Sequence, residues 1–186
     1  MIEKYLVAHC APTLAGLKTA NLFSMPYGPE DRPEQEVFLF NRLLNHKGVY
    51  IKILSCFETK ALIYVYRKER LLADWQNPAA GRFLTDRGYD VRDPLISLAR
   101  LSENLQSADD FPHEIGFFLG FPPEDILGFI ENCGKNYKCC GCWKVYCDEE
   151  AARKTFLQYK KCKEVYCKCF AEGRPVSKLC IRENKI

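Results

Sequence analysis

The feature that most constrains the fold is a pair of apolar, β-branched runs, residues 49–56 and 61–66, that lie close together in the sequence. A short polar connection, Phe57-Glu58-Thr59-Lys60, separates them. Two such runs on either side of a short connection are typical of a β-hairpin. The sequence therefore predicts an antiparallel pair of strands in the first half of the chain.

The rest of the chain has mainly helical spacing of its apolar residues. Helices are predicted over residues 12–23, 34–47, 68–76, 78–87, 94–106, 123–132 and 149–171. A loop is predicted over 26–33 and a strand over 142–147, whereas 113–121 fits either a buried strand or a short helix. Asp93 and Asp148 precede two of these helices and are expected to cap them.

Helices outnumber strands and do not alternate with them regularly, which favours an α+β fold. We expect a small, mainly antiparallel sheet packed with several helices, with a long C-terminal helix. The length of 186 residues fits a single domain over residues 1–186, of which 133–186 is a basic, cysteine-rich part.

The cysteines bear on compartment and chemistry. Nine of the 11 lie after residue 132, and the odd total leaves at least one unpaired. The start of the chain lacks the basic segment and cleavage site of a secretory signal, and no run approaches the roughly 18 apolar residues of a membrane span. We therefore expect a cytoplasmic protein without a membrane span, whose cysteines are thiols, metal ligands or reversible redox pairs.

The charge is divided unevenly along the chain. Residues 1–132 contain 14 basic and 18 acidic residues, whereas residues 133–186 contain 13 and 6. A basic region can bind nucleic acid or an acidic protein. Because arginines are few and no nucleic-acid-binding motif is present, we expect no nucleic-acid partner. The helix at 149–171 should instead turn a solvated face outward, formed by Lys160, Lys161, Lys163 and Lys168.

Four residues predict a catalytic site. Cys10 precedes the helix expected at 12–23, where the positive end of the helix dipole lowers the pKa of a thiol. His113 is the expected base, Glu114 would orient it or act as a base, and Lys18 would contact an anion or act as a further base. The alternative interpretation is a small buried Cys10, a core or helix-start His113 and Glu114, and a surface Lys18.

A second set of residues predicts a metal site. Cys139 and Cys142 have the CxxC spacing, and a zinc or iron site needs a second pair, for which Cys162 and Cys167 on the long helix are the candidates. The same CxxC could also be a redox pair. Helix geometry allows at most two of the three cysteines at 162, 167 and 169 to join one small site.

Aromatic residues suggest a pocket for a flat cofactor such as flavin or haem. Trp143 and Tyr146 are the candidate cofactor-binding residues, with Lys144 between them as a possible anion contact. Further rings that could line such a pocket are Phe117, Phe118, Phe121 and Phe129. The alternative is that these rings form ordinary core packing.

Four segments carry a resemblance to a known family. They are residues 9–22, HCAPTLAGLKTANL, residues 112–122, PHEIGFFLGFP, residues 124–130, EDILGFI, and residues 141–146, GCWKVY, followed by two cysteines at 162 and 167. Together they resemble a family from anaerobic bacteria catalogued as domain of unknown function 3793. The sequence departs from the family pattern at Cys142 and Cys147. The resemblance implies no activity, but points to a flavodoxin-like or iron-related partner.

Three hypotheses about function follow. The first is a thiol-dependent enzyme that uses Cys10 and His113 on an acyl, amide or thioester bond. The second is a non-catalytic metal- or redox-handling protein that uses the C-terminal cysteines in iron or electron-transfer physiology. The third is an interaction module without a site.

Overall fold

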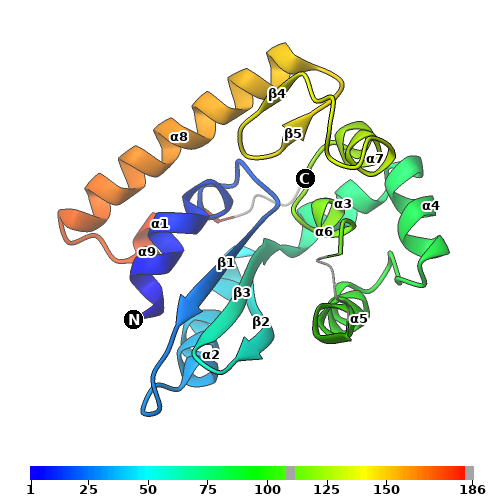
Figure 1. The fold of residues 1–186 in the computed structure, drawn as a ribbon. Helices are drawn as coiled ribbons and strands as arrows, with labels where there is room; N and C mark the ends of the chain where they lie inside the picture. The colour runs from blue at the N-terminus through cyan, green and yellow to red at the C-terminus, as the bar shows by residue number, and fades with distance from the viewer. Residues whose placement is uncertain (108–111, 183–186) are drawn as a thin grey trace.

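A computed structural model describes residues 1–107 and 112–182, and its centre is a three-stranded antiparallel sheet in the order β1-β3-β2 (Figure 1). The predicted hairpin is confirmed: β2 (Val49–Phe57) pairs with β3 (Lys60–Arg67). The third strand, β1 (Ala20–Pro26), pairs with the other edge of β3. The small antiparallel sheet and the several helices around it confirm the predicted α+β class.

The prediction of a helix over 12–23 is wrong. The first helix, α1 (Ile2–Leu14), ends where that helix should begin, and β1 occupies the second half of the range. Helix α1 buries an apolar face that includes Ile2, Leu6 and Leu14. The strand forms because β3, more than 30 residues further along, offers a free edge, and short-range periodicity carries no signal of such pairing.

The helices after α1 are α2 (Pro33–Leu44) with a 3₁₀ turn η1 (Asn45–Lys47), α3 (Lys68–Trp75), α4 (Pro78–Asp86), α5 (Pro94–Ser107), α6 (Ile115–Phe118), α7 (Pro123–Glu131), α8 (Glu149–Ala171) and α9 (Val176–Leu179). The helices from α2 to α8 follow the predicted order, and α9 was not predicted. The ambiguous segment 113–121 is thus a short helix within a turn. The strand predicted at 142–147 is shorter, because only β5 (Lys144–Val145) pairs, with β4 (Cys139–Cys140).

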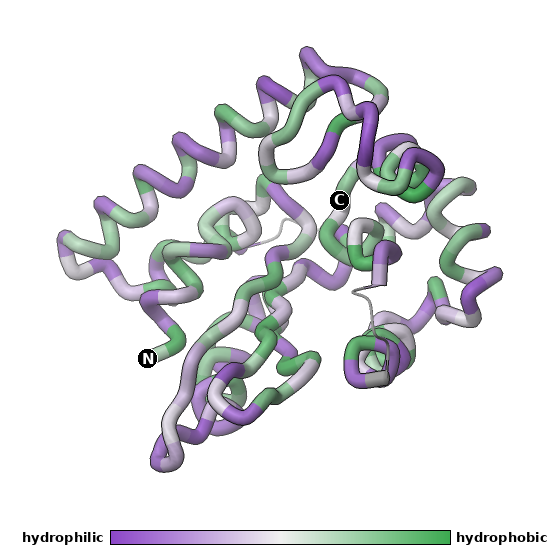
Figure 2. The backbone as a smooth tube through the Cα atoms, in the orientation of Figure 1, coloured by the Kyte–Doolittle hydropathy of each residue, from purple (hydrophilic) through white to green (hydrophobic). Residues whose placement is uncertain are grey.

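The sheet has a hydrophobic core on each face, and alternation along β3 assigns its residues to them. Ala61, Ile63 and Val65 face α1, α2 and α9, while Tyr64 and Tyr66 face the layer of helices from α3 to α7. Figure 2 shows apolar backbone segments in the centre and hydrophilic ones along the outer turns of α8. The result is a sheet between two helical layers.

Helix α8 begins at the expected cap, since the Asp148 carboxylate accepts a hydrogen bond from the Ala151 N–H at 3.0 Å. It packs along α1 (Figure 1), and the four lysines expected on its outer face are exposed. Among the described helices, none combines the length and apolar character that crossing a membrane requires.

A buried arginine joins distant parts of the chain. The Arg67 guanidinium, 1% exposed, donates hydrogen bonds to the carbonyl oxygens of Thr13 and Leu14 at 2.7 and 2.8 Å. It also donates to the carbonyl of Ile181 at 2.8 Å. The carbonyls of Thr13 and Leu14 lie at the end of α1, where carbonyl groups lack partners within the helix. Arg67 therefore closes α1 and holds the C-terminal segment against it.

Candidate functional site

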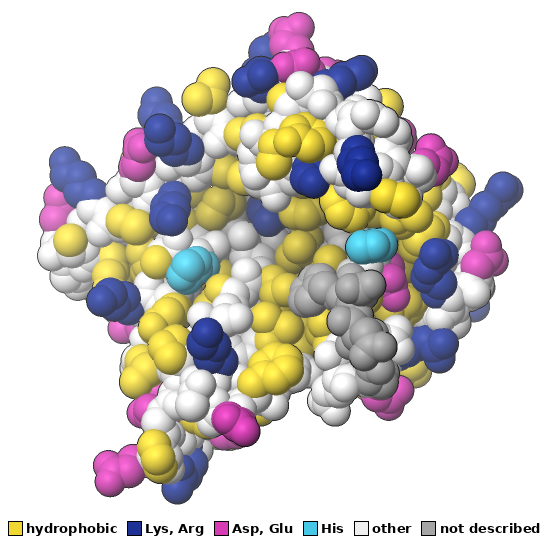
Figure 3. Space-filling view, viewed as in Figure 1, with side chains coloured by type: hydrophobic (Ala, Val, Ile, Leu, Met, Phe, Trp, Pro, Cys, Tyr) yellow, Lys and Arg dark blue, Asp and Glu magenta, His cyan; other side chains and the backbone are white. Residues whose placement is uncertain are grey.

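A pocket of about 550 Å³ lies between α6, α7 and the β4–β5 hairpin. The face of the molecule in Figure 3 is hollowed near its centre, and hydrophobic side chains gather there. The residues that line the pocket come from three segments: Pro112, His113, Ile115, Gly116; Phe121, Asp125, Ile126, Phe129; and Cys140, Gly141, Cys142, Trp143, Lys144. A concave, mostly apolar cavity with a few polar groups is the usual form of a small-molecule site.

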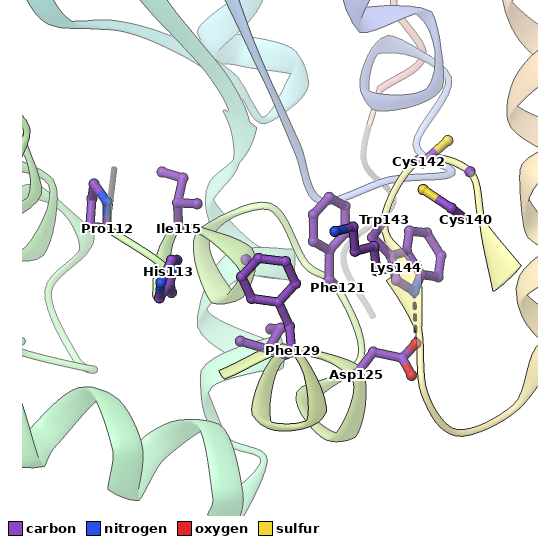
Figure 4. A pocket seen from close by; sticks show the side chains of 13 residues that line it. Pro112, His113, Ile115, Phe121, Asp125, Phe129, Cys140, Cys142, Trp143 and Lys144 are labelled. Atoms are coloured by element: carbon purple, nitrogen blue, oxygen red, sulfur yellow. Dashed lines mark hydrogen bonds between the residues drawn. The ribbon is translucent and has the colours of Figure 1, made fainter. Parts of the chain in front are cut away.

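Aromatic rings form the walls of this pocket (Figure 4). The His113 and Phe129 rings meet edge to face with centroids 5.2 Å apart. Phe121 and Trp143 lie 5.1 Å apart and are tilted by 30°. Trp143 also packs edge to face on Phe156 of α8, at 4.6 Å. The rings therefore come from the turn before α6, from α7, from the connection between these helices and from the hairpin, and Trp143 packs against rings on two sides.

Asp125 positions the hairpin against α7. Its carboxylate, which is 3% exposed, accepts a hydrogen bond from Trp143 Nε1 at 2.7 Å (Figure 4). It also accepts from the backbone N–H groups of Tyr146 and Cys147, at 2.7 and 2.9 Å. The sequence analysis missed this role, because an acid in the first turn of a helix looks like ordinary dipole compensation.

Lys144 lines the pocket, but its amine is already engaged. Nζ donates a hydrogen bond to the Gly134 carbonyl at 2.8 Å and lies over the rings of Phe129 and Tyr137 at 5.5 and 5.0 Å from their centroids. Tyr146, the third predicted cofactor residue, is not among the lining residues; its ring packs over Gly128 and its buried hydroxyl has no hydrogen-bond partner in the described part of the chain.

Lys18 lies beside the pocket and is buried, at 7% exposure. Its Nζ is 5.0 Å from the centroid of Phe121, and it interacts electrostatically with the thiol of Cys142, so it adjoins two lining residues. The alternative of a surface lysine is therefore wrong. Burial lowers the pKa of the Lys18 amine to about 8, against a smaller opposite effect of the Cys142 and Cys10 thiols.

Cys10 is not at a helix start. It lies in the second half of α1 and is fully buried in the core between the sheet, α1, α2 and α9. Burial raises the pKa of its thiol. The nucleophile prediction assumed that a helix N-terminus lowers the pKa of the Cys10 thiol. That assumption is wrong. The catalytic role itself stays a prediction.

The side chains of His113 and Glu114 contact different parts of the molecule. The exposed His113 ring faces the pocket, whereas the Glu114 carboxylate accepts a hydrogen bond from the Tyr89 hydroxyl at 2.9 Å. Glu114 therefore anchors α6 to the helical layer rather than orienting His113. Cys10 is not among the residues that line the pocket, so the predicted dyad does not share this cavity.

The predicted metal ligands are divided among different surroundings. Cys139 is buried in a small core with Val145 and Ala152, whereas Cys142 is exposed at the pocket. Cys162 and Cys167 lie on α8, and Cys167 packs against the core beside α1. Within residues 1–107 and 112–182, no three His, Cys, Asp or Glu side chains form a group that could hold a metal ion.

The chain belongs to a family described as a protein of unknown function, DUF3793, whose model matches residues 6–180. The resemblance seen in the sequence is thus confirmed over nearly the whole chain. No curated protein and no solved structure matches the chain.

Proposed function

We propose that this member of the family binds a planar, aromatic small molecule in the pocket between α7 and the β4–β5 hairpin. The observation that carries the proposal is the convergence of four rings, His113, Phe121, Phe129 and Trp143, on one cavity of about 550 Å³. Flat rings offer stacking and edge-to-face contacts to a flat ligand, and each such contact adds about 0.5–1.5 kcal/mol beyond its buried area.

The volume and walls of the pocket support this class of ligand. Small-molecule sites commonly span roughly 300–1,000 Å³ and bury most of the ligand against apolar side chains. The two lining residues with a charged side chain, Asp125 and Lys144, are already paired, Asp125 with the hairpin and Lys144 with a backbone carbonyl. A ligand recognised mainly through its aromatic faces, such as a flavin or a haem, fits these surroundings better than a highly charged one.

Binding is tested by titrating the protein with flavin mononucleotide and with haemin, and measuring the dissociation constant by calorimetry. Phe129→Ala removes a wall of the pocket and should weaken binding of the preferred ligand about tenfold, which corresponds to about 1.4 kcal/mol. The matched control is Phe38→Ala on α2, which removes an exposed ring elsewhere on the surface and should leave binding unchanged. Failure of both ligands to bind, or equal effects of the two variants, would contradict the proposal.

A redox-handling function is the second candidate, because two free, exposed thiols line the same pocket. Cys140 and Cys142 both border the cavity, so an electron-accepting ligand would lie beside them. A flavodoxin-like or iron-related partner would suit such chemistry. After anaerobic purification, this candidate predicts roughly one bound iron, zinc or flavin per chain, lost on replacing Cys140 and Cys142 by serine. A protein that carries none and keeps all thiols unreactive argues against it.

A further inference from the structure

Lys18 lies beside the pocket, next to Phe121 of its wall, and its backbone is held in place. The turn after α1 places it there: the N–H groups of Leu17 and Lys18 both donate to the Pro12 carbonyl, at 2.8 and 3.2 Å. The next residue, Thr19, donates its hydroxyl to the Asp74 carboxylate at 2.6 Å. The backbone of Lys18 is thus fixed by hydrogen bonds on both sides, and the fold sets the direction of the Lys18 side chain.

The surroundings of the amine lack an acceptor. The Lys18 side-chain amine forms no hydrogen bond or ion pair with any residue that the structure describes. Its nearest ionisable neighbours are two thiols, Cys142 and Cys10, and its Nζ rests over the Phe121 ring. A lysine in such a site releases its proton more readily than an exposed lysine, and the neutral amine is a nucleophile. Burial that lowers its pKa to about 8 agrees with this geometry.

A purely structural role explains this residue poorly. An amine enclosed by an aromatic ring and two thiols loses its hydration without gaining a partner, which disfavours folding. Lys144 shows the contrast within the same pocket: its amine is tied to the Gly134 carbonyl and is therefore satisfied. The two lysines thus have different chemistry, and only Lys18 has an unengaged amine.

We propose that Lys18 forms an imine with a carbonyl group of the planar ligand, an aromatic aldehyde or ketone. This inference rests on the proposed function of the pocket. The amine lone pair attacks the carbonyl carbon, a C–N bond forms, and a proton passes from nitrogen to oxygen. Loss of the oxygen as water then gives the imine, and addition of water reverses the sequence. The carbonyl enters from the end of the pocket lined by Phe121 and Cys142.

The experiment uses a planar aldehyde, 2-hydroxy-1-naphthaldehyde, followed by borohydride reduction and mass spectrometry of the whole protein and its peptides. Lys18 should be labelled about tenfold or more faster than exposed lysines at pH 8, because those are almost wholly protonated there. Lys18→Arg should abolish the fast label. The matched variant Lys160→Gln, which removes an exposed lysine on α8 away from the pocket, should retain it.

A second measurement separates this inference from the proposal on which it rests. 2-Naphthol has the same ring system but no carbonyl, and its binding is measured by calorimetry on the wild-type protein and on Lys18→Met. If 2-naphthol binds both proteins and the aldehyde labels Lys18 selectively, the inference is supported. If 2-naphthol binds and labelling is spread evenly over exposed lysines such as Lys154, the imine is wrong while the pocket stands. If 2-naphthol does not bind, the pocket and the imine are both overturned.

Discussion

Two charged side chains, Lys18 and Asp125, are buried beside the same pocket but differ in what surrounds them. The Asp125 carboxylate accepts three hydrogen bonds, whereas the Lys18 amine has none among the described residues. A buried charge contributes to stability only when it is paired. Asp125 therefore stabilises the site, and Lys18 lowers the stability of the fold in return for an available amine.

The cost of Lys18 should appear as a pH-dependent difference between the wild type and Lys18→Met. The folded-state pKa is lowered to about 8 from 10.5. Below pH 8 the amine must be charged inside the fold, so the methionine variant should be more stable, by up to roughly 3 kcal/mol. Between pH 8 and 10.5 the unfolded chain holds the proton that the folded protein has released. Rising pH therefore stabilises the wild type, and the difference in unfolding free energy between the two proteins becomes smaller.

Urea unfolding of both proteins from pH 6.5 to 10.5 measures this difference. A buried group that does not interact with Lys18, such as the Tyr64 hydroxyl with its raised pKa, affects both proteins alike and cancels in the difference. The thiols of Cys10 and Cys142 interact with Lys18, so the difference includes their response as well. Lys160→Met, on the exposed face of α8, is the control and should differ from the wild type by a constant amount. If the difference in unfolding free energy between the wild type and Lys18→Met is also independent of pH, the Lys18 amine is charged in the folded protein throughout this range.

At the scale of elements, the β4–β5 hairpin cannot stand alone. Its ladder consists of two residue pairs, and an isolated two-stranded hairpin is marginally stable at best in water. It is held instead by Asp125 of α7 on one side and by contacts of Trp143 with Phe156 of α8 on the other. The wall of the pocket is therefore ordered by tertiary contacts.

Replacing Asp125 should loosen this wall. Asp125→Ala leaves three donors without their acceptor and should lower the free energy of unfolding by roughly 3 kcal/mol or more. Asp125→Asn should lower the free energy of unfolding by less, because the amide oxygen of asparagine can still accept from the two backbone N–H groups. Urea unfolding followed by tryptophan emission measures both effects. Glu124→Ala, the exposed neighbouring acid, is the control and should change stability by no more than about 0.5 kcal/mol. Equal losses at the two positions would argue against the role of Asp125.

At the scale of the whole molecule, two cations hold the C-terminal segment to the rest of the chain. Arg67 bonds Ile181 together with the end of α1, and Lys47 Nζ donates to the carbonyls of Ser177 and Cys180 at 2.6 and 2.9 Å. Val176 and Cys180 bury their side chains in the core under α1. The segment 176–180 is thus part of the packed structure.

Arg67→Met should therefore release this segment. Three buried carbonyl oxygens lose a charged donor, so we expect a loss of roughly 3 kcal/mol or more. The Ile181 amide, which donates to the Leu14 carbonyl at 3.0 Å, should exchange its hydrogen much faster than in the wild type. Arg153→Met, which removes an exposed pair with Glu149 on α8, should cost only about 0.3–0.5 kcal/mol. Unchanged exchange at Ile181 in Arg67→Met would show that the arginine does not hold the segment.

Local patterns in the sequence were enough to predict the hairpin of β2 and β3, the helix after Asp93, and α8 with its cap at Asp148. Each depends on residues within a few positions of one another, through period-two alternation, helical spacing or an N-cap. The same rules failed for β1, which pairs with β3 and with no other strand in the described part of the chain. They also failed for Cys10, since the true start of α1 changed its position relative to the helix dipole.

The candidate site was predicted only in part. The sequence by itself determined which residues could serve, the rings near 121–143 and the lysines at 18 and 144, and it determined the family. Only the tertiary structure decided that Lys18 is buried against Phe121 and Cys142, that Asp125 is bonded to the hairpin, and that Cys10 lies elsewhere. The physical reason is that burial, and with it the pKa and reactivity of a side chain, depends on contacts between segments that are distant in the sequence. The partners of Asp125 lie 18 to 22 residues away. Phe121 and Cys142 lie still further from Lys18, and short-range periodicity encodes neither set of contacts.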